Sequence, residues 1–196
     1  AIILGFVVFW PLGLALLAGS VAAPAGGVDG MEFPNQAPSS DGQGHLMLAG
    51  SATLQRNFVP FYGAALYVPA SVRSVEQLLG GLSPCRIQLV WLTPEMDSDA
   101  VREYWRKALE AAAGDEQAGR VHGQIERLVQ ALPAAQRGQR LVFDYVPDAR
   151  MKVLVDDRPL VQLAGVEFNR SVLAVWLGAT APADFRAALV ARLGQR

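Results

Sequence analysis

The spacing of hydrophobic residues predicts β-strands in two stretches of the chain, one before residue 93 and one after residue 139. Residues 46–55 and 57–68 are rich in β-branched, aromatic and leucine residues without a helical repeat, which is typical of strands. Pro60 predicts an edge or a bulge there, because proline cannot donate to a strand ladder. A period of two over 85–92 predicts another strand. Later strands are expected over 140–147, over 151–157 and from Leu160 onward, with turns at 147–149 and Arg158-Pro159.

The helical repeat of hydrophobic residues is clearest between residues 97 and 132. Asp97 or Ser98 can cap a helix whose apolar face carries Trp105, and Gly114 ends it. Residues 121–132 repeat the pattern and predict a second helix. Shorter helices are expected over 71–79, before the Gly80-Gly81 pair, over 168–177, before Gly178, and over 183–193, after Pro182.

The order of these elements predicts the fold class. Strands, helices, strands and helices follow one another with short, hairpin-like connections, and the sequence has no internal repeat. This order is typical of an α+β domain in which a layer of helices covers a large, mainly antiparallel sheet. Trp91, Trp105 and Trp176 are expected to pack the core, and Cys85 is expected to be a buried, inert thiol.

The first 28 residues contain no charged residue and are almost continuously apolar. Residues 1–22 are interpreted as a signal peptide cleaved after Ala22, or alternatively as a retained membrane anchor. Residues 23–44, rich in Gly, Pro, Ser and Asn, are expected to form a linker with one short strand near 28–33. Both interpretations place the rest of the protein in the periplasm or another exported location. Contact with a membrane is expected only through an uncleaved N-terminal segment.

Composition and charge exclude several classes of function. The chain of 196 residues has a net charge of -1 and no basic block, which argues against a nucleic-acid partner. It has one cysteine and two histidines, without the spacing of metal ligands. A glycine-rich phosphate loop and a nucleophile elbow are also absent from the sequence. We therefore expect neither a metal nor a cofactor.

Several stretches together resemble the chalcone isomerase-like family, specifically its bacterial exported branch. They are GSATLQRNFVPFYGAALYVPA, SVEQLL, RIQLVWLTPEMDSDAVREYWRKALE, FDYVPDARMKVLVDDRPL and VEFNRSVLAVWLG. The resemblance lies in their order and spacing, and it implies a family domain over 28–196. It also implies an open-faced β-sandwich with a ligand cleft between the sheet and the helices.

The plant isomerases of this family close a flavanone ring with an early-strand arginine and a network of Tyr, Asn and Thr/Ser side chains. Here the arginine position corresponds to Gly50 or Leu54, and neither supplies a charge. A threonine is replaced by Tyr62, and the hydroxyl of the late helix is lost at Val175. Tyr62 keeps a hydroxyl but displaces it by the length of a ring, and the catalytic tyrosine can correspond to Tyr104. Flavanone-forming catalysis is therefore not expected, and no catalytic residue is assigned.

The fatty-acid-binding relatives suggest a different use of the same cleft. In them an arginine and a tyrosine hold a carboxylate, and Arg56 with Tyr62 or Tyr104 can imitate that pair. Arg56 shares a face with Leu54 if the strand is regular, and Asn57 beside it completes the expected set of ligand-binding residues. The alternative is that Arg56 only caps a hairpin in solvent. Tyr67 lies on the strand face opposite Tyr62, so at most one of the two lines a cleft.

Three hypotheses about function follow. The first is an exported, non-catalytic protein that binds a small amphipathic or fatty-acid-like ligand in an apolar cleft. The second is an isomerase or intramolecular lyase with a rearranged site based on Arg56 and tyrosine hydroxyls. The third is a module of the cell envelope whose partner is another protein.

Overall fold

The computed structural model describes residues 27–28, 30–39, 42, 44–81, 83–147 and 150–195. The predicted signal peptide or anchor over 1–22 lies outside these residues. Within the predicted linker over 23–44 the structure describes three short strands where one was expected. A hairpin joins β1 (Gly27–Val28) to β2 (Met31–Glu32), and β3 (Gln36–Pro38) pairs with the next strand along the chain. Within the described ranges, no helix is long and apolar enough to cross a membrane.

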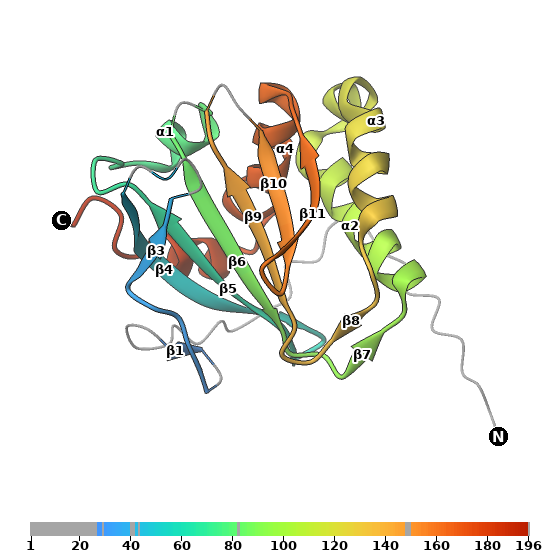
Figure 1. Cartoon of the computed structure of the whole chain (residues 1–196), viewed down its shortest axis with the longest axis horizontal. Helices are drawn as coiled ribbons and strands as arrows, with labels where there is room; N and C mark the ends of the chain where they lie inside the picture. The colour runs from blue at the N-terminus through green and yellow to red at the C-terminus, as the bar shows by residue number, and fades with distance from the viewer. Residues whose placement is uncertain are drawn as a thin grey trace.

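A seven-stranded antiparallel sheet forms the body of the molecule (Figure 1). Its strands follow the order β11-β10-β9-β6-β5-β4-β3. Their bounds are β3 (Gln36–Pro38), β4 (His45–Arg56), β5 (Val59–Val68), β6 (Cys85–Trp91), β9 (Arg140–Tyr145), β10 (Met151–Val155) and β11 (Arg158–Leu163). A separate small pair joins β7 (Glu95–Met96) to β8 (Ala135–Gln136).

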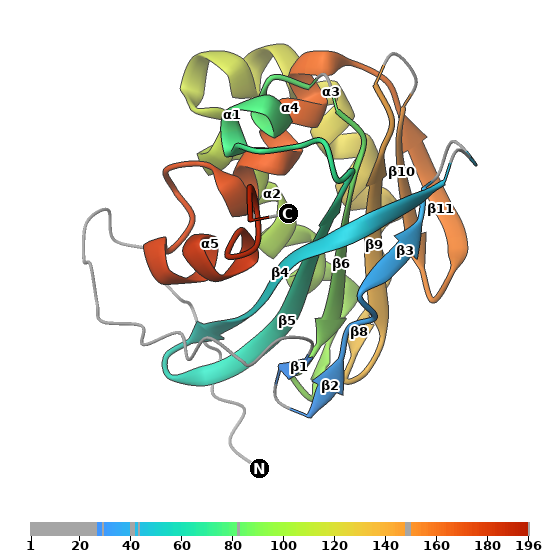
Figure 2. The same cartoon turned by 90° about the vertical axis from the view of Figure 1, so that its left-hand side faces the viewer.

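The helices form a layer on one face of this sheet, as Figure 2 shows from the side. They are α1 (Val75–Leu79), α2 (Ser98–Ala113), α3 (Asp115–Ala131), α4 (Val166–Leu177) and α5 (Ala183–Leu189). The arrangement is the predicted α+β, open-faced β-sandwich.

Local chemistry explains where the structure departs from the predicted helix starts. Helix α1 begins at Val75 and not at 71, because Ser74 caps it: the Gln77 amide donates to Ser74 Oγ, and the Ser74 amide donates to Gln77 Oε1. Helix α3 begins at Asp115 and not at 121. Acidic residues in its first turn favour this start, because they lie at the positive end of the helix dipole.

The turn between β10 and β11 was also mispredicted. It is formed by Asp156 and Asp157, whose φ angles of 48° and 65° lie in the left-handed region that aspartate tolerates. The predicted turn residues Arg158 and Pro159 instead begin β11. Proline is acceptable there because β11 is an edge strand.

Alternation along the strands divides the sheet into two faces. Tyr62, Ala64 and Leu66 of β5 point toward the helices and belong to the main core. Ala65 and Tyr67 point to the other face, where they join a smaller hydrophobic cluster that includes Phe33. The prediction that Tyr62 and Tyr67 lie on opposite faces is confirmed.

Helix α5 packs directly on the backbone of β4, at Gly50. A Cβ atom at Gly50 would lie 2.1 Å from the carbonyl oxygen of Ala188 and 2.6 Å from that of Leu189. The amide of Arg192 donates to the carbonyl of Ala49 at 2.8 Å and holds the chain after α5 against the same strand. Only glycine permits this approach, because any side chain would need the space that the α5 backbone occupies.

We therefore expect Gly50→Ala to lower the free energy of unfolding by about 3 kcal/mol or more, since backbone atoms cannot move aside as a flexible side chain would. Urea titration followed by tryptophan fluorescence would measure the change. Gly123→Ala is the matched control. Nothing lies within 4 Å of a Cβ at that exposed α3 position, so alanine should stabilise the protein by roughly 0.5–1 kcal/mol. Equal effects of the two substitutions would contradict the close approach at Gly50.

Candidate functional site

A cluster of aromatic side chains fills the space between the sheet and the helices. Its ring centroids lie 4.9 to 6.5 Å apart, mostly in edge-to-face or tilted geometry, which suits the quadrupoles of aromatic rings. The members come from β5, β6, β9, α2, α4 and α5: Phe61, Tyr62, Trp91, Tyr104, Trp105, Phe143, Trp176 and Phe185. The cluster therefore joins every layer of the fold at one place.

The hydroxyl of Tyr62 is the polar centre of this cluster. It accepts a hydrogen bond from the Tyr104 hydroxyl at 3.3 Å and another from Trp176 Nε1 at 3.1 Å. Tyr62 is only 1% exposed, so these bonds replace the water that burial removes. The sequence predicted Trp176 as packing alone. Its polar role depends on how α4 meets the sheet, and no local sequence pattern signals that.

Both tyrosine hydroxyls keep their protons at neutral pH. Burial raises the pKa of Tyr62 well above its ordinary value, and the neighbouring Tyr104 adds to the rise. Burial likewise raises the pKa of Tyr104 to about 12. The positive charge of Arg56 lowers both pKa values, but by less than burial raises them. The site therefore offers neutral hydroxyl groups next to a cation.

Arg56 ends β4 with its guanidinium over two rings of the cluster. Its central carbon lies 5.0 Å from the centroid of the Phe61 ring and 5.5 Å from that of Tyr104, which is cation–π geometry. A register shift between Leu54 and Gln55 breaks the regular alternation on which its placement was predicted. Arg56 is partly buried, and among the described residues it has neither an ion-pair nor a hydrogen-bond partner.

The structure thus brings together three of the four predicted ligand-binding residues. Asn57 does not join the other three residues, because it lies exposed in the β4–β5 turn, with a φ of 50°. It makes no hydrogen bond to Tyr62 or Tyr104 in the described part of the chain. Arg56, Tyr62 and Tyr104 therefore form the candidate site.

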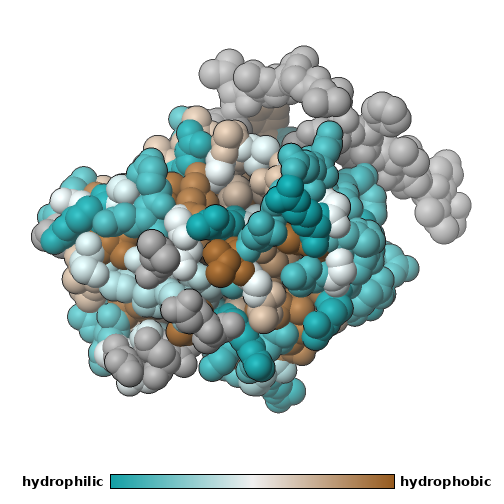
Figure 3. All heavy atoms as spheres, turned by 90° about the horizontal axis from the view of Figure 1, so that it is seen from above, coloured by the Kyte–Doolittle hydropathy of each residue, from teal (hydrophilic) through white to brown (hydrophobic). Residues whose placement is uncertain are grey.

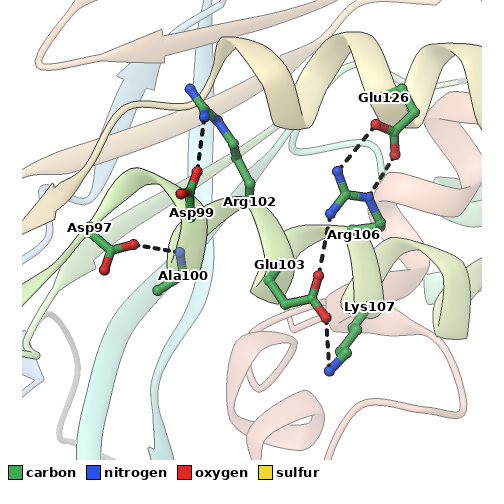
Figure 4. Close-up of polar contacts among 8 residues, drawn as sticks. All are labelled: Asp97, Asp99, Ala100, Arg102, Glu103, Arg106, Lys107 and Glu126. Atoms are coloured by element: carbon green, nitrogen blue, oxygen red, sulfur yellow. Dashed lines mark hydrogen bonds and ion pairs between the residues drawn. The ribbon is translucent and has the colours of Figure 1, made fainter. Parts of the chain in front are cut away.

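Helix α2, which carries Tyr104, is held in position by charged side chains (Figure 4). Asp97 caps its start by accepting from the Ala100 amide at 2.8 Å. Arg106 binds Glu126 of α3 through two nitrogens, at 2.7 and 3.2 Å. Helix α2, fixed in this way, brings Tyr104 and Trp105 into contact with the other rings of the aromatic cluster.

The position expected for a catalytic arginine is closed by the packing of α5. At Gly50 the carbonyl oxygens of Ala188 and Leu189 occupy the place that a side chain would take. Leu54, the other possible counterpart, is apolar and pairs with Tyr62 across the ladder. Val175 of α4 is partly buried and has no hydroxyl. Within the described residues, no group of three or more His, Cys, Asp or Glu side chains could hold a metal ion.

Comparison with known proteins agrees with this architecture. The model of a family described as chalcone isomerase-like matches residues 25–191. The crystal structure of a fatty-acid binding protein from Arabidopsis thaliana superposes with a TM-score of 0.69 at 13% sequence identity. That similarity covers 90% of this chain and 100% of the plant protein. Curated protein sequences gave no match.

The buried tyrosines predict that the protein loses stability at alkaline pH. Burial raises the pKa of Tyr104 and of Tyr67 from 10.0 to about 12. Between these values the folded state binds more protons than the unfolded state, so the free energy of unfolding falls as pH rises from about 10 to 12 and is unaffected by these groups below 9. The fall is about 1.4 kcal/mol for each unit of raised pKa and each tyrosine.

Urea titrations at pH 9 and pH 11, with tyrosinate absorbance recorded in parallel, would measure this loss. Tyr104→Phe keeps the ring and removes one titrating group, so the variant should lose less stability over the same interval than the wild type. Tyrosinate formation with a pKa near 10 in the still-folded protein would show that these hydroxyls are not protected.

Proposed function

The chain belongs to the chalcone isomerase-like family, and we propose that it is a non-catalytic member that binds a small amphipathic ligand of the fatty-acid type. The observation that carries the proposal is Arg56. Its guanidinium lies over two aromatic rings beside two neutral tyrosine hydroxyls, and within the described residues no carboxylate neutralises it. A ligand carboxylate supplies the missing partner.

The chemistry of the three side chains suits a carboxylate head group. A guanidinium binds both carboxylate oxygens through a planar fork, a geometry that lysine cannot provide. A protonated tyrosine hydroxyl donates to a carboxylate, whereas a tyrosinate would repel it. Because Tyr104 gives its proton to Tyr62, the Tyr62 proton is the one that the pair can offer to a ligand. The raised pKa values of Tyr62 and Tyr104 thus keep these groups in the form that favours binding.

The aromatic cluster supplies the apolar surface for the rest of such a ligand. Because Tyr62 is 1% exposed, an acyl chain reaches its hydroxyl only after neighbouring rings turn aside. Burial of each methylene group contributes about 0.8 kcal/mol, which offsets the cost of this rearrangement for a chain of moderate length. Trp91 and Trp176 belong to the cluster, so ligand entry should change the tryptophan fluorescence.

Two further observations support binding without catalysis. The backbone of α5 closes the position at Gly50 where an early-strand arginine would stand in the family's isomerases. In addition, a solved structure with the same fold is named as a fatty-acid binding protein.

We expect Arg56→Ala to weaken the affinity for a medium-chain fatty acid such as decanoate by at least about tenfold, since it removes the charged partner of the carboxylate. Arg56→Lys should recover only part of the affinity, because it restores the charge without the fork. Tryptophan fluorescence titration would give the dissociation constants.

Arg73→Ala serves as the control, because Arg73 is an exposed arginine next to α1 whose backbone amide, and not its guanidinium, makes the local hydrogen bond. Its affinity should equal that of the wild type. Decanol, which lacks the carboxylate, should bind the wild type and Arg56→Ala equally. If decanoate did not bind the wild-type protein, or bound Arg56→Ala equally well, the proposed site would be wrong.

We also propose that the protein is exported, on the basis of the charge-free apolar stretch before Asp29. The expected result in a bacterial host is a protein found outside the cytoplasm, with a new N-terminus at Ala23 if signal peptidase cuts after Ala22. Cell fractionation followed by N-terminal sequencing would test this. Replacing Leu14 and Leu16 with arginine should retain the protein in the cytoplasm, and export of that variant would contradict the proposal.

A further inference from the structure

The turn between β4 and β5 carries the most exposed large hydrophobic side chains among the described residues. Phe58 is 75% exposed and Val59 is 60% exposed, and both follow directly after Arg56 and Asn57. Figures 1 and 2 place this turn at the lower end of the sheet. The tip therefore presents an aromatic and an aliphatic side chain to its surroundings, two and three residues after Arg56 of the proposed carboxylate site.

The backbone conformation at Phe58 is unusual for an aromatic residue. Asn57 and Phe58 have φ angles of 50° and 63°, as a two-residue hairpin turn of this kind requires. Asparagine tolerates the left-handed region, but the second position normally holds glycine, and a bulky aromatic residue rarely adopts it. Phe58 thus occupies a strained position in which its side chain gains nothing from the protein's own core.

Among the described residues, few large hydrophobic side chains are exposed outside this turn. On the opposite, upper end, shown in Figure 3, hydrophobic side chains form small areas between hydrophilic ones. Val166, the remaining large hydrophobic residue described as exposed, is 45% exposed and lies beside Gly81 at the start of α4. The two residues at the hairpin tip are therefore a local feature and not part of a generally apolar surface.

We propose that this hairpin tip inserts into the surface of a lipid bilayer, from which the protein takes up its ligand; the inference rests on the proposed function. Two side chains are too few for a protein–protein interface, which needs about 20 to 30 residues on each side. They suffice for shallow insertion into a bilayer, where an aromatic and an aliphatic group enter the acyl region without any shaped partner.

The register of the hairpin places Arg56 directly behind its tip. Asn57 and Phe58 form the two-residue turn, and Arg56 pairs with Val59 at the next step of the ladder. When Phe58 enters the hydrocarbon boundary, the long side chain of Arg56 can extend to the level of anionic oxygen atoms. A fatty acid in a bilayer holds its carboxylate at that same level. Its head group would therefore meet Arg56 before its chain leaves the membrane.

The test compares transfer of decanoate to the full-length protein from phosphatidylcholine vesicles and from vesicle-free solution. Phe58→Gly combined with Val59→Ser should slow transfer from vesicles at least about tenfold, because the hydrophobic contribution of the tip is lost. The affinity for decanoate in solution should stay unchanged. Glycine relieves the positive φ at this position, so the variant should fold at least as well as the wild type.

A second measurement is independent of any membrane contact made by the N-terminal residues. A tryptophan introduced as Phe58→Trp should be quenched by lipids brominated in their acyl chains, whereas one introduced as Val166→Trp should not. Unchanged transfer from vesicles, or equal quenching of the two variants, would overturn the proposal. If the protein binds decanoate in solution but the tip tryptophan is not quenched, membrane insertion is refuted and the proposed function is not. If the tip tryptophan is quenched but the protein does not bind decanoate, the proposed function is refuted instead.

Discussion

The hydroxyl oxygen of Tyr62 accepts hydrogen bonds from α2 and from α4, and this buried oxygen determines how the helix layer meets the sheet. A hydroxyl oxygen has two lone pairs, and both are used. Each donor would otherwise be left without a partner in a nonpolar interior, which costs about 1 to 3 kcal/mol for each group. The aromatic contacts around it are non-directional by comparison, so the hydroxyl selects one arrangement of the rings.

Arg56 gives the site its electrostatic asymmetry. A partly buried guanidinium normally pairs with a carboxylate, as Arg86 does with Asp144 on the other face of the sheet, at 2.6 Å through each of two nitrogens. Arg56 instead lies over the faces of Phe61 and Tyr104, where ring quadrupoles stabilise it only in part. The contrast between the two arginines shows that the fold can neutralise a cation within the sheet and does not do so at the end of β4 among the described residues.

The sequence predicted most of the fold because the main elements follow simple periods. Alternation revealed β6, and the helical repeat with Asp97 and Gly114 as its ends gave α2 almost to the residue. The errors fall where backbone geometry decides. Two consecutive aspartates with positive φ form a turn that composition attributed to Arg158-Pro159, and the capping box at Ser74 shortens α1.

The candidate site was only partly predictable for a similar reason. Arg56, Tyr62 and Tyr104 were identified from a resemblance, but the bulge between Leu54 and Gln55 that sets the place of Arg56 has no clear sequence signal beyond Pro60. At Gly50, one of the positions expected for the family's catalytic arginine, the absence of a side chain is coupled to the packing of α5. A side chain there and the backbone of α5 need the same space, so an arginine introduced at this position would displace the helix that carries Phe185 against Tyr62. With α5 in this place residue 50 has no room for an arginine, and this packing supports the proposed ligand binding without ring-closing chemistry.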